Sequence, residues 1–211
     1  MYSCSKPRCD RCRMHAELCL CAEIPRVGTR ARVVLVMHAT EEKKPSNTGR
    51  LAHLCLPNSE IRLRGERGAP LRLDGLVDPE HETLLLRLAP ESAELTPGLV
   101  AGLQRPVRLL VPDGTWSQAS STGARLARDL PGLRQVKLSV GERPSLYRLR
   151  AEHHPDGMST FEAIARALEV LEGPGVRAPL ERIFRVMVER VLWTRGKLPA
   201  GDVTGGLPGR R

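Results

Sequence analysis

The sequence predicts an α/β fold, in which a mainly parallel sheet is flanked by helices and preceded by a small cysteine-rich module. Three observations support this fold: apolar runs with strand character, segments of helical periodicity between and after them, and cysteines gathered near the N-terminus. Strands that alternate with helices are typical of parallel sheets, because each helix carries the chain back to the same end of the sheet. The expected strands span residues 31–37, 83–88, 107–111 and 136–140.

Composition narrows the class of protein. The chain has 211 residues, of which 41% are hydrophobic but only 3% aromatic, so we expect one domain with a small appendage and an aliphatic core. Its apolar runs are too short for a transmembrane helix and its N-terminus lacks an apolar signal core, which favours a cytoplasmic protein without a membrane partner. The net charge of +9 favours a polyanionic partner, with nucleic acid first; heavy arginine use by a GC-rich genome is the alternative. No segment predicts a protein partner.

The N-terminal cysteines have the spacing of a metal site. They follow the pattern Cys9-x2-Cys12-x6-Cys19-x-Cys21, and the chain shows no export signal that would favour disulfides. Zinc binds four thiolates tetrahedrally, so we expect structural zinc in a module of residues 1–27, with free or redox-active thiols as the alternative. Either His15 or Cys4 is available as a replacement ligand.

The first expected strand leads into a polar loop and a helix start. Pro45 and Ser46 mark the loop, and Asn47 is a suitable N-cap. Backbone amides at this helix start, with Arg50, suit an anion, although a plain capped helix after a solvated loop is the simpler interpretation.

Residues 56–106 are the least informative stretch. Beyond the strand at 83–88 we expect a loop with a short helix at 90–105. Four arginines in this stretch either line a track for phosphates or are simply solvated: Arg62, Arg64, Arg67 and Arg72.

The strand at 107–111 delivers a turn, residues 112–116, to the start of a helix that runs to about residue 130. Loops 38–50, 112–118 and 141–150 each follow an expected strand. In a parallel sheet the carboxyl ends of the strands share one edge, where ligands bind, so we expect these loops to meet around a pocket.

Two helices and a tail complete the chain. Ser159 and Glu162 form a capping box, which already gives Glu162 a structural role. The last helix, about residues 179–193, has one apolar stripe, and residues 196–211 form a Gly- and Pro-rich basic tail that we expect to be flexible.

Five segments, in order along the chain, resemble motifs of the DTW-domain family. Asp113-Gly114-Thr115-Trp116 resembles its signature, and the cysteine pattern resembles its N-terminal cluster. The segments at 40–51, 147–150 and 159–163 resemble its other motifs, so the likeness covers roughly residues 8–172. Agreement of several motifs in order is far more specific than any one of them.

The resemblance implies a tRNA-uridine aminocarboxypropyltransferase with a SPOUT-like fold and a catalytic domain over residues 28–195. Such enzymes transfer the 3-amino-3-carboxypropyl group of S-adenosylmethionine to N3 of a tRNA uridine and release 5′-methylthioadenosine. The alternatives are a SPOUT-like RNA methyltransferase and a zinc-containing RNA-binding protein without catalysis.

The resemblance also assigns roles to residues. Asp113, Thr115 and Trp116 are the expected catalytic residues. Asp113 either takes the proton of uridine N3 or binds the ammonium of the transferred arm, and Trp116 either stacks on adenine, walls the sulfonium or only packs the turn. The expected S-adenosylmethionine contacts are Thr48, Gly49, Arg50, Pro112, Gly114, Tyr147, Ser159, Thr160 and Glu162. The expected RNA contacts are Lys43, Lys44, Arg148 and Arg150.

Overall fold

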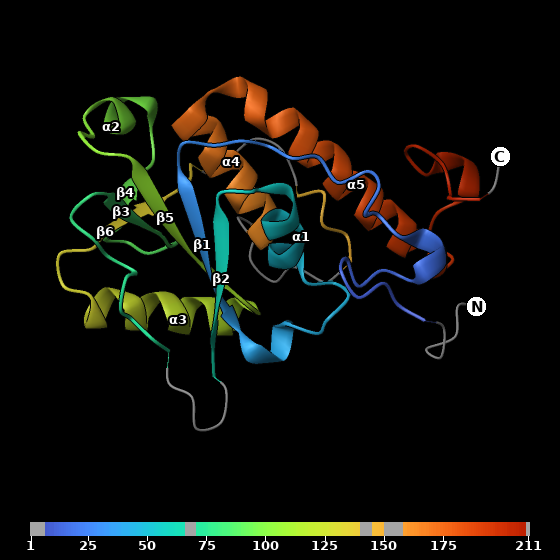
Figure 1. Cartoon of the computed structure of the whole chain (residues 1–211), viewed down its shortest axis with the longest axis horizontal. Helices are drawn as coiled ribbons and strands as arrows, with labels where there is room; N and C mark the ends of the chain where they lie inside the picture. The colour runs from blue at the N-terminus through green and yellow to red at the C-terminus, as the bar shows by residue number, and fades with distance from the viewer. Residues whose placement is uncertain (1–6, 66–70, 140–144, 150–157, 210–211) are drawn as a thin grey trace.

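A six-stranded parallel sheet forms the centre of the computed structural model, which describes residues 7–65, 71–139, 145–149 and 158–209 (Figure 1). The strand order is β2-β1-β5-β3-β6-β4, and every paired strand runs parallel to its neighbour. This confirms the predicted α/β fold; the more specific likeness to the SPOUT fold stays a prediction. The strands are β1 Arg32–His38, β2 Ser59–Arg64, β3 Glu82–Leu86, β4 Ala93–Glu94, β5 Val107–Asp113 and β6 Arg134–Lys137.

Helices cover both faces of the sheet (Figure 1). One face packs against α1, α4 and α5, and the opposite face packs against α3. The helices are α1 Thr48–Cys55, α2 Pro97–Ala101, α3 Trp116–Asp129, α4 Thr160–Glu172 and α5 Arg177–Thr194. Short 3-10 helices lie at η1 Ala16–Leu18, η2 Ala39–Glu41, η3 Pro174–Val176 and η4 Ala200–Asp202.

Alternation along the central strands explains this three-layer packing. In β1, Val33 and Leu35 belong to the core beneath α1, α4 and α5, whereas Val34 and Val36 contact the smaller core beneath α3. Successive side chains of a strand point to opposite faces, so a strand covered on both faces is apolar throughout. This is why the sequence shows an apolar run at residues 33–37 in β1 and another at residues 109–112 in β5, where Arg108 precedes the run.

The edge strands were harder to predict. β2 was missed because its six residues are all half-buried and alternate between polar and apolar at the edge of the sheet. β4 was also missed, because it is only two residues long. The strand expected at 136–140 begins earlier, at Arg134, and ends at Lys137; residue 140 lies outside the described residues.

The C-terminal segment packs on the body of the protein over residues 199–209. Val203 and Leu207 are buried in the main core, and the backbone N–H of Thr204 donates to Glu189 at 2.7 Å. Composition alone, which suggested a flexible tail, did not foresee these contacts. None of the helices in the described part of the chain is long and apolar enough to cross a membrane.

Candidate active site and cysteine cluster

A cavity of about 470 Å³ opens at the carboxyl edge of the sheet. This volume lies within the range of roughly 300–1,000 Å³ that is typical of small-molecule sites. The expected site residues that line it are Thr48, Pro112, Asp113, Gly114, Thr115, Trp116, Tyr147, Ser159 and Thr160. Segments far apart in the sequence therefore meet around one cavity.

The topology of the sheet explains the position of the cavity. β1 and β5 are neighbours, but the chain leaves β1 toward α1 on one face and leaves β5 toward α3 on the opposite face. Such a divergence opens a crevice outside the carboxyl ends of the strands, where ligands bind in open α/β sheets. The start of α4 closes the same region, since Ser159 and Thr160 line the cavity.

Asp113, the last residue of β5, joins the starts of two helices. Its carboxylate is 2% exposed and accepts hydrogen bonds from Asn47 Nδ2 at 2.8 Å and from Thr160 Oγ1 at 2.6 Å. Asn47 Oδ1 in turn accepts the backbone N–H of Arg50 at 2.7 Å and so caps α1. Asp113 thus fixes the starts of α1 and α4 relative to β5.

Gly49 makes room for this carboxylate. A Cβ atom at Gly49 would lie 2.6 Å from Asp113 Oδ2 and 2.8 Å from Leu35 Cδ2, much closer than nonbonded atoms approach. Gly49 is absent from the cavity lining. Its position supports a role in seating Asp113 rather than direct contact with a ligand.

The turn after Asp113 is held by a capping box. Thr115 Oγ1 accepts the N–H of Gln118, and the Gln118 side chain accepts the N–H of Thr115 at 2.9 Å. A Cβ atom at Gly114 would lie 2.9 Å from the Gln118 side chain, so the tight turn needs glycine there. Trp116, the first residue of α3, lines the cavity and is 42% exposed, which places it at the rim.

Glu162 holds a loop in place. It is buried, accepts the N–H of Leu146 at 2.7 Å and the hydroxyl of Ser145 at 2.7 Å, and completes the predicted capping box with Ser159. Glu162 does not line the cavity. The loop that it holds presents Tyr147, which lines the cavity and whose hydroxyl donates to the carbonyl of Ser46 at 2.8 Å.

The remaining expected contacts lie away from the cavity. The Arg50 guanidinium donates to the carbonyl of Glu42, and its pKa is lowered by burial and by the nearby charge of Arg13 in the cysteine-rich module. Lys44 forms an ion pair with Glu41 at 2.5 Å. Lys43 and Arg148 are exposed and outside the cavity lining, and Arg150 lies outside the described residues.

Sequence reasoning gave no role to several residues of the lining. Glu41 lines the cavity and is only 1% exposed, whereas Leu88 lines it and is 48% exposed. Arg87 and Lys137 also line it, from the ends of β3 and β6. All four follow or end a strand, so the rule that ligands bind at the carboxyl ends of parallel strands could have singled them out.

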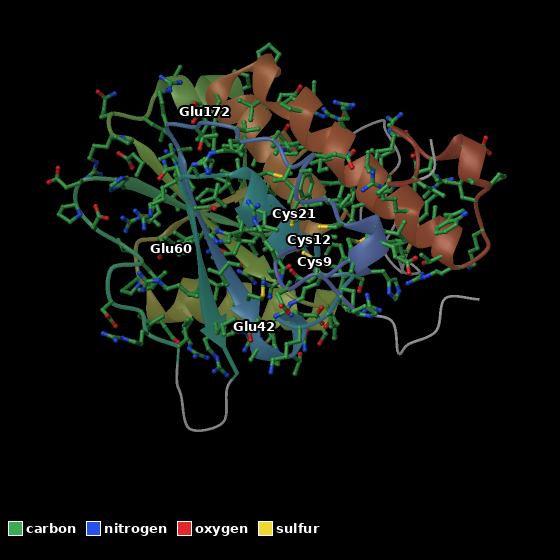
Figure 2. The ribbon with its side chains drawn as sticks, turned by 45° about the vertical axis from the view of Figure 1, so that its right-hand side comes forward. Cys9, Cys12, Cys21, Glu42, Glu60 and Glu172 are labelled. Carbon is green, nitrogen blue, oxygen red and sulfur yellow. The ribbon has the colours of Figure 1, made fainter. Side chains whose placement is uncertain are left out.

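Four cysteines come together outside the cavity. The Sγ atoms of Cys9, Cys12, Cys19 and Cys21 all lie within 4.8 Å of one another, and Figure 2 shows Cys9, Cys12 and Cys21 gathered in one place. The Cys9–Cys21 separation is 3.6 Å and the Cys12–Cys19 separation is 3.8 Å. The backbone N–H of Cys12 lowers the pKa of Cys9 to about 6, whereas burial raises the pKa of Cys21 to about 12. This cluster is close enough to hold a metal ion.

Arg190 of α5 fastens the cysteine-rich N-terminal segment to the body of the protein. It is 1% exposed, and its guanidinium donates to the carbonyl of Cys19 at 3.1 Å and to Glu23 at 2.5 Å. It also donates to the carbonyl of Gly206 at 3.4 Å, so one side chain joins the module, α5 and the C-terminal segment. The sequence gave no indication of this, because Arg190 looked like one of many surface arginines.

Comparison with known proteins gave matches over most of the chain. The DTW domain family matches residues 6–192. The tRNA-uridine aminocarboxypropyltransferase 2 of Macaca fascicularis is 30% identical over 179 residues, which cover 79% of this chain and 57% of that protein. The protein of the same name from Mus musculus is 31% identical over 176 residues, with the same coverage of both chains. The chain therefore spans little more than half the length of these curated relatives, and no solved structure matches it.

Proposed function

Because the chain belongs to the DTW domain family, we propose that it transfers the 3-amino-3-carboxypropyl group of S-adenosylmethionine to N3 of a uridine in tRNA. The observation that carries the proposal is the cavity, because four of the family's motifs, those at 40–51, 113–116, 147–150 and 159–163, each contribute residues to its lining. The names of the curated relatives support both the reaction and the tRNA substrate.

The cavity suits the donor chemically. Leu86, Val111 and Leu138 offer apolar walls for the adenosyl part, while the carboxylate of Asp113 offers negative charge for the ammonium of the arm. Bound S-adenosylmethionine would supply a sulfonium that activates the adjoining carbon of the arm. The bond from that carbon to sulfur would be replaced by a bond to uridine N3, so that 5′-methylthioadenosine leaves and the N3 proton is released to water. The chain's own task is to orient the arm, because the carbon that reacts is the one held in line with the acceptor nitrogen.

We assign Asp113 to holding the ammonium of the transferred arm. Two hydrogen bonds fix its buried carboxylate in position, and a carboxylate has about four lone-pair sites, so it has capacity for a further donor. The alternative is that Asp113 accepts the proton of uridine N3. We favour the positioning role because the two hydrogen bonds hold the carboxylate at a fixed point of the cavity lining, as orientation of the arm requires.

Trp116 and Leu88 form the exposed apolar part of the rim. A uridine must leave its RNA stack to bring N3 into the cavity, and an exposed indole is a good surface for a displaced base. We therefore propose that Trp116 contacts the entering nucleotide. Its exposure supports this over a role in stacking on adenine deep in the cavity.

We further propose that the cysteine cluster binds zinc. Zinc–sulfur bonds of about 2.3 Å in a tetrahedron require sulfur–sulfur separations of about 3.8 Å. The separations of 3.6 Å and 3.8 Å fit this requirement. Residues 1–27 then form a zinc module on a catalytic domain of residues 28–195, with residues 196–211 as a C-terminal extension. The role of the metal is structural, because the cysteines lie outside the lining of the cavity.

The reaction is tested with the purified chain, S-adenosylmethionine and unmodified tRNA, followed by mass spectrometry of the nucleosides. The proposal predicts a uridine heavier by one aminocarboxypropyl group. A gain of one methyl group would instead identify an RNA methyltransferase. Binding of tRNA without either product, and without binding of S-adenosylmethionine in calorimetry, would identify a noncatalytic RNA-binding protein.

A further inference from the structure

Arg64 reaches the first turns of α3, the helix that also carries Arg125. Arg64 ends β2, and its Nη2 donates to the carbonyl of Gln118 in the first turns of α3 at 3.1 Å. Burial lowers the pKa of Arg64, and the charge of Arg125, farther along α3, lowers it further. Arg125 stands seven residues after Gln118, two turns along the same face of α3. The two positive charges therefore lie along one face of this helix.

Carboxylates neutralise the nearby Arg62 and Arg72, but none in the described structure pairs with Arg64 or Arg125. Arg62 contacts Glu60 at 2.7 Å and Arg72 contacts Asp74 at 2.9 Å. Within the ranges that the structure describes, no carboxylate forms an ion pair with Arg64 or Arg125. Arg64 Nε is also buried without a hydrogen-bond acceptor among these residues.

Like charges held together at a protein surface favour the binding of an anion, which relieves their repulsion. The planar guanidinium group is suited to phosphate in particular, because its N–H groups match two phosphate oxygens at once. Of the four arginines that the sequence offered for a phosphate track, Arg67 lies outside the described residues. Among the other three, Arg64 is the one without an acidic partner in the described structure, and it lies along the same helix as Arg125.

The pair lies close to the rim of the cavity. Gln118, which accepts from Arg64, stands between Ser117 and Ala119, and both of these line the cavity. Gln118 Nε2 also donates to Thr40 Oγ1 at 3.2 Å, which links the loop after β1 to the same turn of α3. Figure 1 shows the carboxyl ends of β1 and β2 at one edge of the sheet, beside α3.

We propose that Arg64 and Arg125 bind a backbone phosphate of the tRNA strand that carries the acceptor uridine. The inference rests on the proposed function, since it places the RNA across the rim of the same cavity. The strand would run from this arginine pair over the first turn of α3, with the acceptor base entering beside Trp116.

The test measures the affinity of the full chain for fluorescently labelled, unmodified tRNA at several salt concentrations. Arg64→Gln and Arg125→Gln should each raise Kd about tenfold. Each should also lower the slope of log affinity against log salt by about 0.7–0.9, the value for one phosphate contact. Arg128→Gln is the matched control, because it removes the same charge from the same helix but at an arginine already paired with Asp129 at 2.7 Å.

Two further measurements separate the possible results. Arg64→Lys should restore much of the affinity if charge is what matters, and an unchanged melting temperature of each variant excludes loss of folding. If Arg64→Gln and Arg125→Gln bind tRNA as Arg128→Gln does while the wild type makes the product, the inference is wrong and the proposed function stands. If the wild type neither binds tRNA nor makes the product, both are wrong.

Discussion

The cysteine cluster and the cavity both gather side chains that could bind a ligand, but they are built in opposite ways. The cysteines come from thirteen consecutive residues, and their sulfur atoms face one another. The cavity is assembled from segments more than a hundred residues apart, and two apolar side chains at its rim, Trp116 and Leu88, stay exposed.

This difference is what we expect if the cysteine cluster has a structural role and the cavity binds the substrates. The cluster turns its ligands inward, and Arg190 binds the surrounding loop to α5. The cavity fixes its central carboxylate with two hydrogen bonds yet leaves an opening to solvent. We therefore expect changes at the cluster to affect mainly stability, and changes at the cavity to affect mainly activity.

Removal of the metal should have the largest effect on stability. Without the proposed zinc, no bonds hold the four cysteine thiols in one place, and residues 1–27 lose the interaction around which they fold. A strong chelator should lower the melting temperature by about 10 °C, which corresponds to several kcal/mol for a chain of this size. Calorimetry with and without chelator measures this, and added zinc should reverse it. A melting temperature indifferent to the chelator would contradict a structural metal.

Asp113→Asn should have the largest effect on activity. The amide replaces an acceptor with a donor that faces Asn47 or Thr160 and removes the negative charge. We expect kcat/KM to fall by about a hundredfold or more. Steady-state kinetics and calorimetry with S-adenosylmethionine measure this, with the exposed Asp74→Asn as the control. Weaker binding of S-adenosylmethionine would support arm binding, whereas unchanged binding with lost turnover would favour the role of base.

Trp116→Ala should reduce activity while leaving stability nearly intact. An exposed side chain contributes little to folding, and we expect the free energy of unfolding to change by less than about 0.5 kcal/mol. Loss of one base-stacking contact, about 1–3 kcal/mol, should raise KM for tRNA about tenfold or more. Trp116→Phe keeps an aromatic face and should recover part of the loss. A large fall in stability with unchanged KM would mean that Trp116 only packs the turn.

Glu60, in β2, lies in neither the cysteine cluster nor the cavity lining, and Figure 2 labels it apart from the cysteines. Its ion pairs therefore serve as a reference for ordinary ion pairs at the protein surface. Burial opposes its ionisation, but hydrogen bonds from Arg32 and Arg62 outweigh burial and lower its pKa. Because the folded pKa lies below the ordinary value, the stabilisation is present above that value and is lost as the pH falls through the folded pKa. Urea unfolding should show Glu60→Gln less stable by under about 1 kcal/mol at pH 7 and equal to wild type at low pH. A difference that grows on acidification would contradict this.

Sequence patterns predicted what depends on near neighbours. The cysteine spacing located the cysteine cluster, and the predicted capping residues Asn47 and Ser159 lie at helix starts. The two buried strands could be recognised because both of their faces are covered. Contacts that join distant segments were not predictable: Arg190 clamping the module, and Arg64 reaching α3, depend on how the layers pack.

The positions of the site residues could be predicted from the sequence, but their roles could be predicted only in part. Strand ends predicted that three loops would meet, and the cavity lies where Thr48, Asp113 and Tyr147 come together. Spacing did not reveal that Gly49 and Glu162 act from behind the cavity wall, because that depends on side-chain direction. Motif position alone therefore identifies the neighbourhood of a site but not which of its residues face the ligand.

Cells that lack this protein provide a direct test of whether it transfers the aminocarboxypropyl arm to a tRNA uridine. Their tRNA nucleosides should be analysed by mass spectrometry, with the wild-type chain or Asp113→Asn returned on a plasmid. We expect a uridine bearing the aminocarboxypropyl group to disappear from cells without the protein and to return with the wild-type chain. With Asp113→Asn, that nucleoside should stay absent or scarce. An unchanged level of that nucleoside in cells without the protein, or the loss of a methylated nucleoside instead, would contradict it.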